Sequence, residues 1–254
     1  MFAKPVHTPA ADTGWFTPDW PAAANVGSLV TTRHGGVSPA PYGSLNLGDH
    51  VGDDAANVAA NRALLRAALP AEPAWLQQVH GMTVVDAATV APGSVPVADA
   101  SFSRTPGAVC AVMTADCLPV LLADRAGTVV GAAHAGWRGL CGGVIEATIA
   151  AMGEPAANLV AYLGPAIGPE AFEVGAEVRA AFMAHDSHAA AAFDAIADGK
   201  YLADIYLLAR QRLAAAGVTA VYGGDACTVI ERERFFSYRR DQVTGRMASL
   251  IWLG

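Results

Sequence analysis

A cysteine and a histidine lie on the two strands of a predicted apolar hairpin, both at its open end. There their side chains could bind a metal or act as a nucleophile with its base. Within Thr114–Arg138, two β-rich runs flank Asp124–Gly127, a sequence typical of a chain reversal. With a tight reversal centred on 125–126, Cys117 faces His134. Facing side chains have Cβ atoms about 4.5–5.5 Å apart. That separation suits a thiolate about 2.3 Å and an imidazole nitrogen about 2.0 Å from one zinc ion.

Other residues that could do chemistry lie directly after the strand of His134 or at the end of another predicted strand. His80, at the end of another predicted strand, is the third potential ligand. Ala135–Gly139 forms a glycine-rich turn into the next predicted helix, and backbone N–H groups at a helix start favour anions. Arg138 in this turn adds a guanidinium suited to phosphate or carboxylate. Spacing alone leaves two alternatives open: buried packing of Cys117 and a purely hydrogen-bonded role for His134.

The elements that must position these groups include more strands than long helices, which favours an α+β fold with antiparallel pairs. The predicted helices are one capped by Asp53 or Asp54 that ends before Pro70, Leu140–Met152 with Gly153 after it, and Tyr201–Ala216. The predicted strands are Ser28–Thr32, Ala74–Gln78, Val109–Met113, Leu118–Ala123, Val129–His134, Leu159–Leu163, Ala220–Tyr222, Phe235–Arg239 and Met247–Leu253.

Composition excludes several classes of protein. The chain has 254 residues, of which 53% are apolar and 15% charged, so one domain with a sizeable core is expected. No apolar stretch approaches the ~20 residues of a membrane span. The net charge is −7 and Lys4 and Lys200 are the only lysines, so neither a nucleic-acid polymer nor an anionic membrane is an expected partner. The opening residues lack an apolar signal region and the four cysteines form no C-x-x-C pair, which favours the cytoplasm and reduced thiols.

Several motifs are distributed in order over essentially the whole chain. They are Thr31–Ser38, Ser44–Gly48, Gln78–Gly81, Thr114–Pro119, His134–Gly139, Gly164–Gly168 and Phe235–Arg240. Together they resemble the laccase-domain family, known both as polyphenol oxidase and as purine nucleoside phosphorylase. Some bacterial members are called peptidoglycan-editing factors, so a peptidoglycan-precursor editing hydrolase is an alternative function.

The resemblance implies a single-domain, four-layer α/β/β/α sandwich over residues 1–254 with two central mixed sheets. It also implies that His80, Cys117 and His134 bind one metal, usually zinc. Members are described as cleaving adenosine, guanosine, inosine and methylthioadenosine with phosphate, and as deaminating adenosine. The expected partners are therefore a nucleoside and phosphate, and the oligomeric state is left open.

Three protein ligands leave one zinc position open, the pattern of a catalytic site, and such a zinc lowers the pKa of bound water toward ~7. By motif position, the candidate phosphate-binding residues are Arg33 and Arg138, with His34 and Asn46 as polar contacts. Asp116, next to the thiolate, is a candidate ligand-orienting group or proton carrier. For His34 and Asn46, a role in a hydrogen-bonded loop is an equally good interpretation. For Asp116, a turn-forming role is an equally good interpretation.

The other cysteines and histidines are not expected to take part. Cys110, Cys141 and Cys227 are predicted to pack in the core. An exposed turn is predicted for His185 and His188, and a loose N-terminus for His7.

The number of histidines in the chain is too small for a multicopper oxidase. A multicopper oxidase needs about ten histidine ligands, and this chain has 7 histidines in total. Copper at a single Cys-His-His site, with phenol oxidation, stays possible because copper(II) binds such ligands more tightly than zinc. The H-x-E and P-C-x-x-C motifs of zinc nucleoside deaminases are absent, as are phosphate-binding and dinucleotide-binding glycine motifs.

Two other classes of function compete with the metalloenzyme. One is a metal-free hydrolase or deamidase, with Cys117 as nucleophile and His134 as base. Such a pair needs one imidazole, so a role for His80 favours the metal. The other is a metal-bearing interaction protein, which predicts no turnover of a nucleoside with phosphate.

Overall fold

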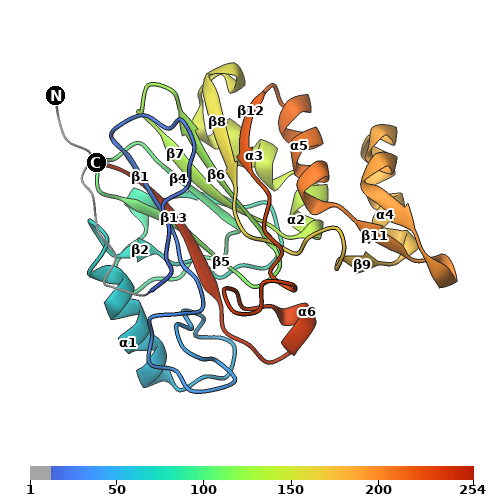
Figure 1. Cartoon of the computed structure of the whole chain (residues 1–254). Coiled ribbons are helices and arrows are strands. Elements are labelled where there is room, and N and C mark those ends of the chain that lie inside the picture. Colours follow the sequence, from blue (N-terminus) through green and yellow to red (C-terminus); the bar gives the residue numbers. More distant parts are fainter. Residues whose placement is uncertain (1–12) are drawn as a thin grey trace.

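Helices enclose two stacked sheets in the computed structural model, which describes residues 13–254 (Figure 1). His7 lies outside the described residues. The layers are α1 (Ala55–Arg66), a four-stranded sheet, a six-stranded sheet, and the helices that follow the second sheet. The α+β class and the two mixed sheets expected from the sequence are confirmed.

The four-stranded sheet has the order β1-β13-β5-β2. Its strands are β1 (Val26–Val30), β13 (Met247–Leu253), β5 (Val109–Thr114) and β2 (Pro73–Ala74). The β2–β5 pair is parallel and the other pairs are antiparallel. Helix α1 covers the outer face, where Leu65 is buried with Leu29 and Leu250. Asp54 caps the start of α1, as predicted, by accepting the N–H of Ala56.

The six-stranded sheet has the order β12-β8-β6-β7-β4-β3. Its strands are β12 (Ala220–Gly223), β8 (Leu159–Leu163), β6 (Leu118–Asp124), β7 (Val130–Ala135), β4 (Ala100–Ser103) and β3 (Val84–Asp86). The outer pairs β12–β8 and β3–β4 are parallel, and the inner pairs are antiparallel. Cys110 and Ile251 of the first sheet pack with Leu121 and Val160 of the second, so these side chains hold the two sheets together.

The outer face of the six-stranded sheet is covered by α2 (Trp137–Gly142), α3 (Val144–Met152) and α5 (Ile205–Ala215). A third, small sheet extends beyond this layer (Figure 1). It has the order β10-β11-β9, from β10 (Phe193–Ala195), β11 (Tyr201–Ala203) and β9 (Glu173–Val174), and carries α4 (Ala176–His185). Nothing in the sequence pattern predicted this sheet.

The register of the β6–β7 hairpin differs from the predicted one. Pro119, not Cys117, pairs with His134, because the connection is wider than predicted. The N–H of Asp124 donates to Val129 O, and the Asp124 carboxylate accepts the N–H groups of Thr128 and Val129. This carboxylate stabilises a longer loop and shifts the pairing by two positions. Cys117 therefore precedes β6 and does not face His134 in the ladder.

Two predicted helices are divided. Tyr201–Ala203 forms strand β11, and α5 begins only after Asp204, whose carboxylate accepts the N–H of Leu207. The Leu140–Met152 prediction covers parts of α2 and α3, which are separated at Gly143 with φ 107°. This left-handed conformation is accessible to glycine, and it turns the chain between the two helices. Gly153 ends α3 as predicted, with φ 68°.

The strand predicted at Phe235–Arg239 is wrong. Phe235 and Phe236 are fully buried in a loop, and Ser237 caps the short helix α6 (Tyr238–Asp241). An apolar pair can fill a core from a loop as well as from a strand, and its period does not separate the two cases. Of Ala74–Gln78, only Ala74 lies in a strand; Gln77 makes an isolated bridge to Val97.

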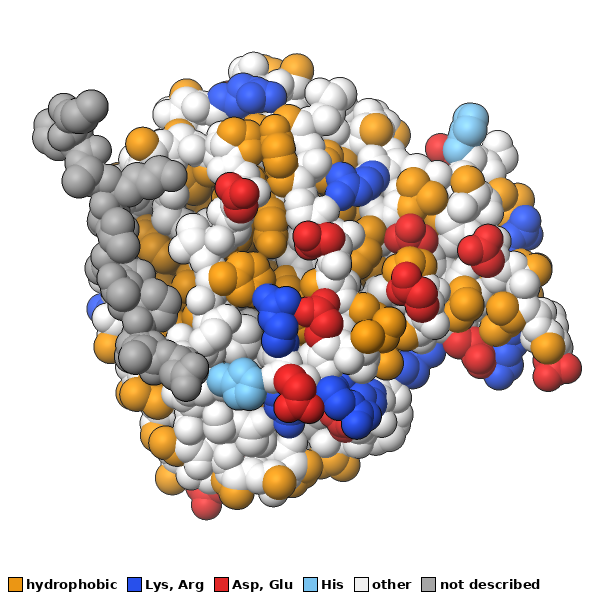
Figure 2. Space-filling view, viewed as in Figure 1, with side chains coloured by type: hydrophobic (Ala, Val, Ile, Leu, Met, Phe, Trp, Pro, Cys, Tyr) orange, Lys and Arg blue, Asp and Glu red, His pale blue; other side chains and the backbone are white. Residues whose placement is uncertain are grey.

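The face viewed in Figure 2 has acidic and basic side chains interspersed, with hydrophobic side chains between them. Within residues 13–254, no helix is both long and apolar enough to cross a membrane.

The first prediction concerns the start of α5. Replacing Asp204 by Ala removes the side chain that caps the helix, and we expect a loss of about 1 kcal/mol in the free energy of unfolding. Denaturant titration measures the loss. Asp194→Ala, at an exposed position in β10, is the control and should change stability little. Equal effects of the two substitutions would show that the cap does not stabilise the helix.

Candidate metal centre

Three ligand side chains converge from separate segments. His80 lies in the loop after β2, Cys117 in the turn between β5 and β6, and His134 in β7. Their ligand atoms all lie within 4.8 Å of one another. The Sγ of Cys117 is 3.6 Å from Nε2 of His80, and the two imidazole ring centres are 4.8 Å apart. The three side chains that the sequence suggested are therefore close enough to share one cation.

The buried carboxylate of Asp99 fixes the orientation of His134. Nδ1 of His134 lies 2.8 Å from Asp99 Oδ1. Because a carboxylate only accepts, Nδ1 carries the hydrogen and Nε2 is the nitrogen left for a cation. The backbone N–H of His134 also donates to the Asp99 carbonyl at 2.7 Å. Asp99 thus fixes both the tautomer and the position of this ligand.

The same carboxylate holds the loop that carries His80. It accepts the backbone N–H groups of Val79, His80 and Gly81 at 3.1, 2.8 and 2.7 Å. These contacts keep His80 in a left-handed conformation, with φ 61°. Burial alone raises the pKa of Asp99, but hydrogen bonds from His134, Gly81 and Val79 outweigh it and lower the pKa below its usual value.

The turn that carries Cys117 is fixed by Asp116. Asp116 is buried, with φ 94°. One carboxylate oxygen accepts Thr228 Oγ1–H and the other accepts the Arg239 N–H, each at 2.6 Å. Asp116 therefore ties the thiolate-bearing turn to α6, and these contacts are those of a turn-forming aspartate. A role as proton carrier stays a prediction.

Gly136 leaves the space that the ligands occupy. A Cβ at this position would lie 2.7 Å from Cδ2 of His80 and 3.0 Å from Sγ of Cys117. Neither ring nor sulfur can move away without leaving the ligand position. Gly136 is therefore required because His80 and Cys117 approach its backbone closely.

The charges of Cys117 and His134 depend on each other. Burial alone raises the pKa of Cys117, but the charge of His134 and hydrogen bonds from His134 and His80 lower it to about 6. Burial likewise opposes a charge on His134, yet Cys117 and Asp99 raise its pKa to about 9. The metal-free pair is thus a thiolate beside an imidazolium near pH 7. By contrast, burial raises the pKa of Cys110 to about 12.

The donor set fits a zinc ion. One thiolate and two imidazoles are ligands that zinc prefers, and a fourth position would remain for water or substrate. The same soft and borderline donors also suit copper. The orientation of His134 Nε2 and the space left by Gly136 show that this chain is built to place donors around a common point.

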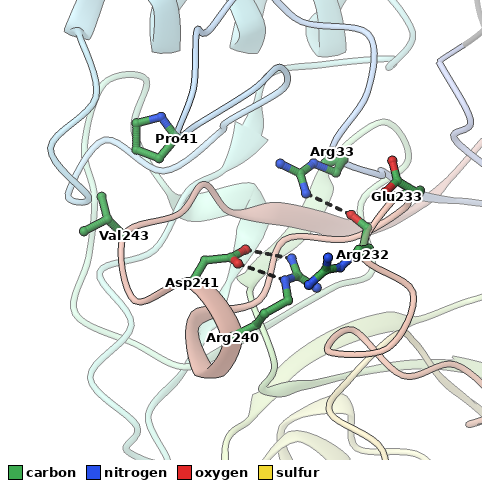
Figure 3. A pocket seen from close by; sticks show the side chains of 7 residues that line it. All are labelled: Arg33, Pro41, Arg232, Glu233, Arg240, Asp241 and Val243. Carbon is green, nitrogen blue, oxygen red and sulfur yellow. Dashed lines mark hydrogen bonds and ion pairs between the residues drawn. The ribbon is translucent and has the colours of Figure 1, made fainter.

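Arg33 lines a different cavity, of about 430 Å³ (Figure 3). The residues around it are Arg33, Pro41, Arg232, Glu233, Arg240, Asp241 and Val243, and the three metal ligands are not among them. Nε of Arg33 donates to Gly43 O and Nη1 donates to Arg232 O. Phosphate binding by Arg33 stays a prediction.

The other predicted phosphate contacts have separate roles. The side chain of Asn46 is fully buried and bonded to Gly48 and Asp53, which matches the hydrogen-bonded loop that the sequence left open. His34 Nε2 contacts the carbonyl of Glu233. Arg138 is the second residue of α2, four positions after His134, but it is exposed and its guanidinium stacks 4.3 Å from the Trp137 ring centre. Phosphate binding by these residues stays a prediction.

Sequence reasoning missed two residues. Asp99 stands alone between small apolar residues just before β4, a local signal of a buried carboxylate that gives no hint of its partners. Arg246 directly precedes β13, and its charge interacts with those of Cys117 and Asp116.

The remaining cysteines are buried and the remaining described histidines are exposed, as expected, but the turn predicted for His185 and His188 is wrong because both lie in helical segments. Cys110, Cys141 and Cys227 are buried. His185 ends α4 and His188 pairs with Asp186, both on the surface.

A substitution at Asp99 tests the arrangement. Asp99→Asn removes the charge that holds the Nδ1 hydrogen of His134, and we expect metal affinity to fall roughly 10- to 100-fold. Chelator competition measures the affinity. Asp124→Asn is the matched control, a buried carboxylate that accepts backbone N–H groups at the far end of β6. It should cost stability and leave metal affinity unchanged; equal losses of affinity would contradict the role of Asp99.

The pH dependence of metal binding follows from the coupled pair. Between about pH 6 and 9, a cation must displace the proton on His134, so apparent affinity should rise roughly tenfold per pH unit and level off above about pH 9. Below this window Cys117 is also protonated and the dependence steepens. Competition with a chelator of known protonation behaviour measures the slope. A metal affinity that stays constant from about pH 7 to 9 would contradict this explanation.

Comparison with known proteins agrees with the resemblance noted in the sequence. Residues 27–254 match the model of the multi-copper polyphenol oxidoreductase laccase family. The purine nucleoside phosphorylase YfiH of Shigella flexneri is 60% identical over 238 residues, covering 93% of this chain and 97% of that protein. A purine nucleoside phosphorylase of Pseudomonas aeruginosa is 58% identical and covers 94% and 98%.

Solved structures share the fold. A crystal structure from Neisseria meningitidis has a TM-score of 0.91 and 58% identity, covering 94% of this chain and 98% of that one. YlmD from Geobacillus stearothermophilus has a TM-score of 0.83 and 31% identity, covering 92% and 93%. The chain therefore belongs to the multi-copper polyphenol oxidoreductase laccase family.

Proposed function

We propose that this protein is a zinc-dependent purine nucleoside phosphorylase that also deaminates adenosine. The observation that carries the proposal is the convergence of His80, Cys117 and His134 within 4.8 Å, with His134 oriented by Asp99. The names of the Shigella and Pseudomonas relatives support phosphate and a purine nucleoside as substrates. The proposed nucleosides are adenosine, inosine, guanosine and methylthioadenosine.

The proposed phosphorolysis exchanges one bond for another. A phosphate oxygen bonds to C1′ of the ribose while the bond from C1′ to the base nitrogen breaks, and the base leaves with the bonding electrons and takes up a proton. The products are the free base and ribose 1-phosphate. A bound zinc ion would supply Lewis-acid stabilisation of an oxygen and activation of water for the deamination.

The chain's own residues would position these reactants. Asp99 keeps His134 in one tautomer, and Gly136 keeps the space around the ligands open. Asp116 holds the Cys117 turn against α6, and any proton transfer by its carboxylate requires a break in its hydrogen bond to Thr228 or Arg239. The fixed ligands thus reduce the reorganisation needed during the reaction.

The family name implies oxidation, but the ligands of this chain support a single-metal reaction. With 7 histidines, the chain cannot hold the roughly ten histidine ligands of a blue site and a trinuclear copper cluster. Copper in the Cys-His-His site would give a phenol oxidase as an alternative. A peptidoglycan-precursor editing hydrolase is another alternative that the same metal would serve.

One observation favours a metal-free hydrolase or deamidase as the second candidate. The Cys117 thiolate beside protonated His134 is the charge state of an activated cysteine nucleophile. His80 distinguishes the two functions. Its Nε2 lies 3.6 Å from the Cys117 sulfur. A metal would use this second imidazole as a ligand, whereas a cysteine nucleophile needs only one imidazole as its base.

Adenosine turnover provides the decisive measurement. The zinc-loaded protein is incubated with adenosine, with and without phosphate, and adenine, inosine and hypoxanthine are separated by chromatography. We expect adenine only with phosphate, and inosine in both cases. Cys117→Ala should abolish both products because a ligand is lost, whereas Cys110→Ala, in the core of β5, should retain most activity.

Metal removal separates the two candidates. Chelation should abolish turnover, and zinc should restore it. Activity that survives complete metal removal but is lost on thiol alkylation supports the cysteine hydrolase. A protein with no turnover of any nucleoside in the presence of phosphate contradicts the phosphorylase.

A further inference from the structure

The position of Arg246 follows from the pairing of two strands. Arg246 directly precedes β13, and Met247, the first residue of that strand, pairs with Thr114, the last residue of β5. The turn that carries Asp116 and Cys117 begins immediately after Thr114. Strand pairing therefore places Arg246 beside the thiolate-bearing turn.

The backbone and stem of Arg246 are fixed. Its N–H donates to Asn46 Oδ1 at 2.9 Å, and its Cγ packs against Gly48, where an added Cβ would lie 2.8 Å away. Nη1 donates to the carbonyls of Thr244 and Gly245 at 3.1 Å. The ring centre of Tyr238 is 5.9 Å from Cζ. The side chain is thus held on several sides.

The remaining donors and the charge of Arg246 are available. Within the described residues, no carboxylate forms an ion pair with Arg246, in contrast to Arg62, Arg212 and Arg240. Within residues 13–254, Nε and Nη2 of Arg246 donate no hydrogen bond; of its guanidinium nitrogens only Nη1 does. Burial lowers the pKa of Arg246, while the charges of Cys117 and Asp116 oppose that effect, and a guanidinium stays protonated in proteins. A half-buried, fixed and unpaired guanidinium next to a metal site favours an anionic ligand.

We propose that Arg246 binds the phosphate co-substrate beside the metal ligands, through the two donors Nε and Nη2. This inference rests on the proposed phosphorolysis for the identity of the anion. It assigns to Arg246 the role that motif position suggested for Arg33 and Arg138, of which Arg33 faces another cavity and Arg138 is exposed.

Arg246→Met keeps an aliphatic stem and removes the charge. In the zinc-loaded enzyme, we expect the KM for phosphate to rise roughly 10- to 100-fold, with the KM for adenosine within about twofold of the original value. Phosphate-independent formation of inosine should be retained. Arg246→Lys restores the charge without the two-donor geometry, so its KM for phosphate should lie between those of the other two proteins.

The matched control is Arg66→Met. Arg66 is also half-buried, donates to the carbonyls of Leu69 and Pro70, and ends α1. It should leave the KM for phosphate unchanged. The zinc content of each variant is measured first, so that a damaged metal site is recognised.

Calorimetric titration of inorganic phosphate into the zinc-loaded proteins gives a readout that does not need turnover. Weaker phosphate binding by Arg246→Met, partly restored by Arg246→Lys, supports the inference. Unchanged phosphate binding in a zinc-retaining Arg246→Met protein overturns it, even if phosphorolysis is observed. If the unsubstituted protein releases no base with phosphate, the phosphorylase proposal fails, and the titration alone decides whether Arg246 holds the anion.

Discussion

The carboxylate of Asp99 is the constraint on which the candidate metal site depends. It accepts a hydrogen bond from Nδ1 of His134 and three more from the backbone of 79–81. A buried carboxylate needs such donors, because the cost of removing its charge from water must be offset by hydrogen bonds. Two ligands from different segments are therefore oriented by one group, and neither can shift without loss of these bonds.

The third ligand is fixed by the same principle. Asp116 uses both carboxylate oxygens to hold the Cys117 turn, and its left-handed backbone directs the chain from one sheet into the other. His80 and Asp116 are both non-glycine residues with positive φ, and both lie in or next to the metal site. Such conformations persist only where surrounding contacts hold them, and here those contacts are hydrogen bonds that the buried carboxylates of Asp99 and Asp116 accept.

The arrangement also explains how a family named for copper oxidation contains relatives named purine nucleoside phosphorylase. One thiolate and two imidazoles suit either zinc or copper, and these two metals support Lewis-acid and redox chemistry respectively. The cavity around Arg33 is not lined by any of these three side chains. The pairing of β13 with β5 instead brings Arg246 beside the turn that carries Cys117.

Local sequence determined the elements whose signals are local. Apolar runs gave the limits of Leu159–Leu163 and Met247–Leu253 correctly, and motif resemblance pointed to the three side chains that converge in the structure. The hairpin register required knowledge that the Asp124 carboxylate caps a longer loop. Asp99 lies 35 residues from His134, and Arg246 lies 200 residues from Asn46. Only tertiary structure could identify these contacts, because strand pairing and burial, not spacing in the chain, decide which polar groups meet.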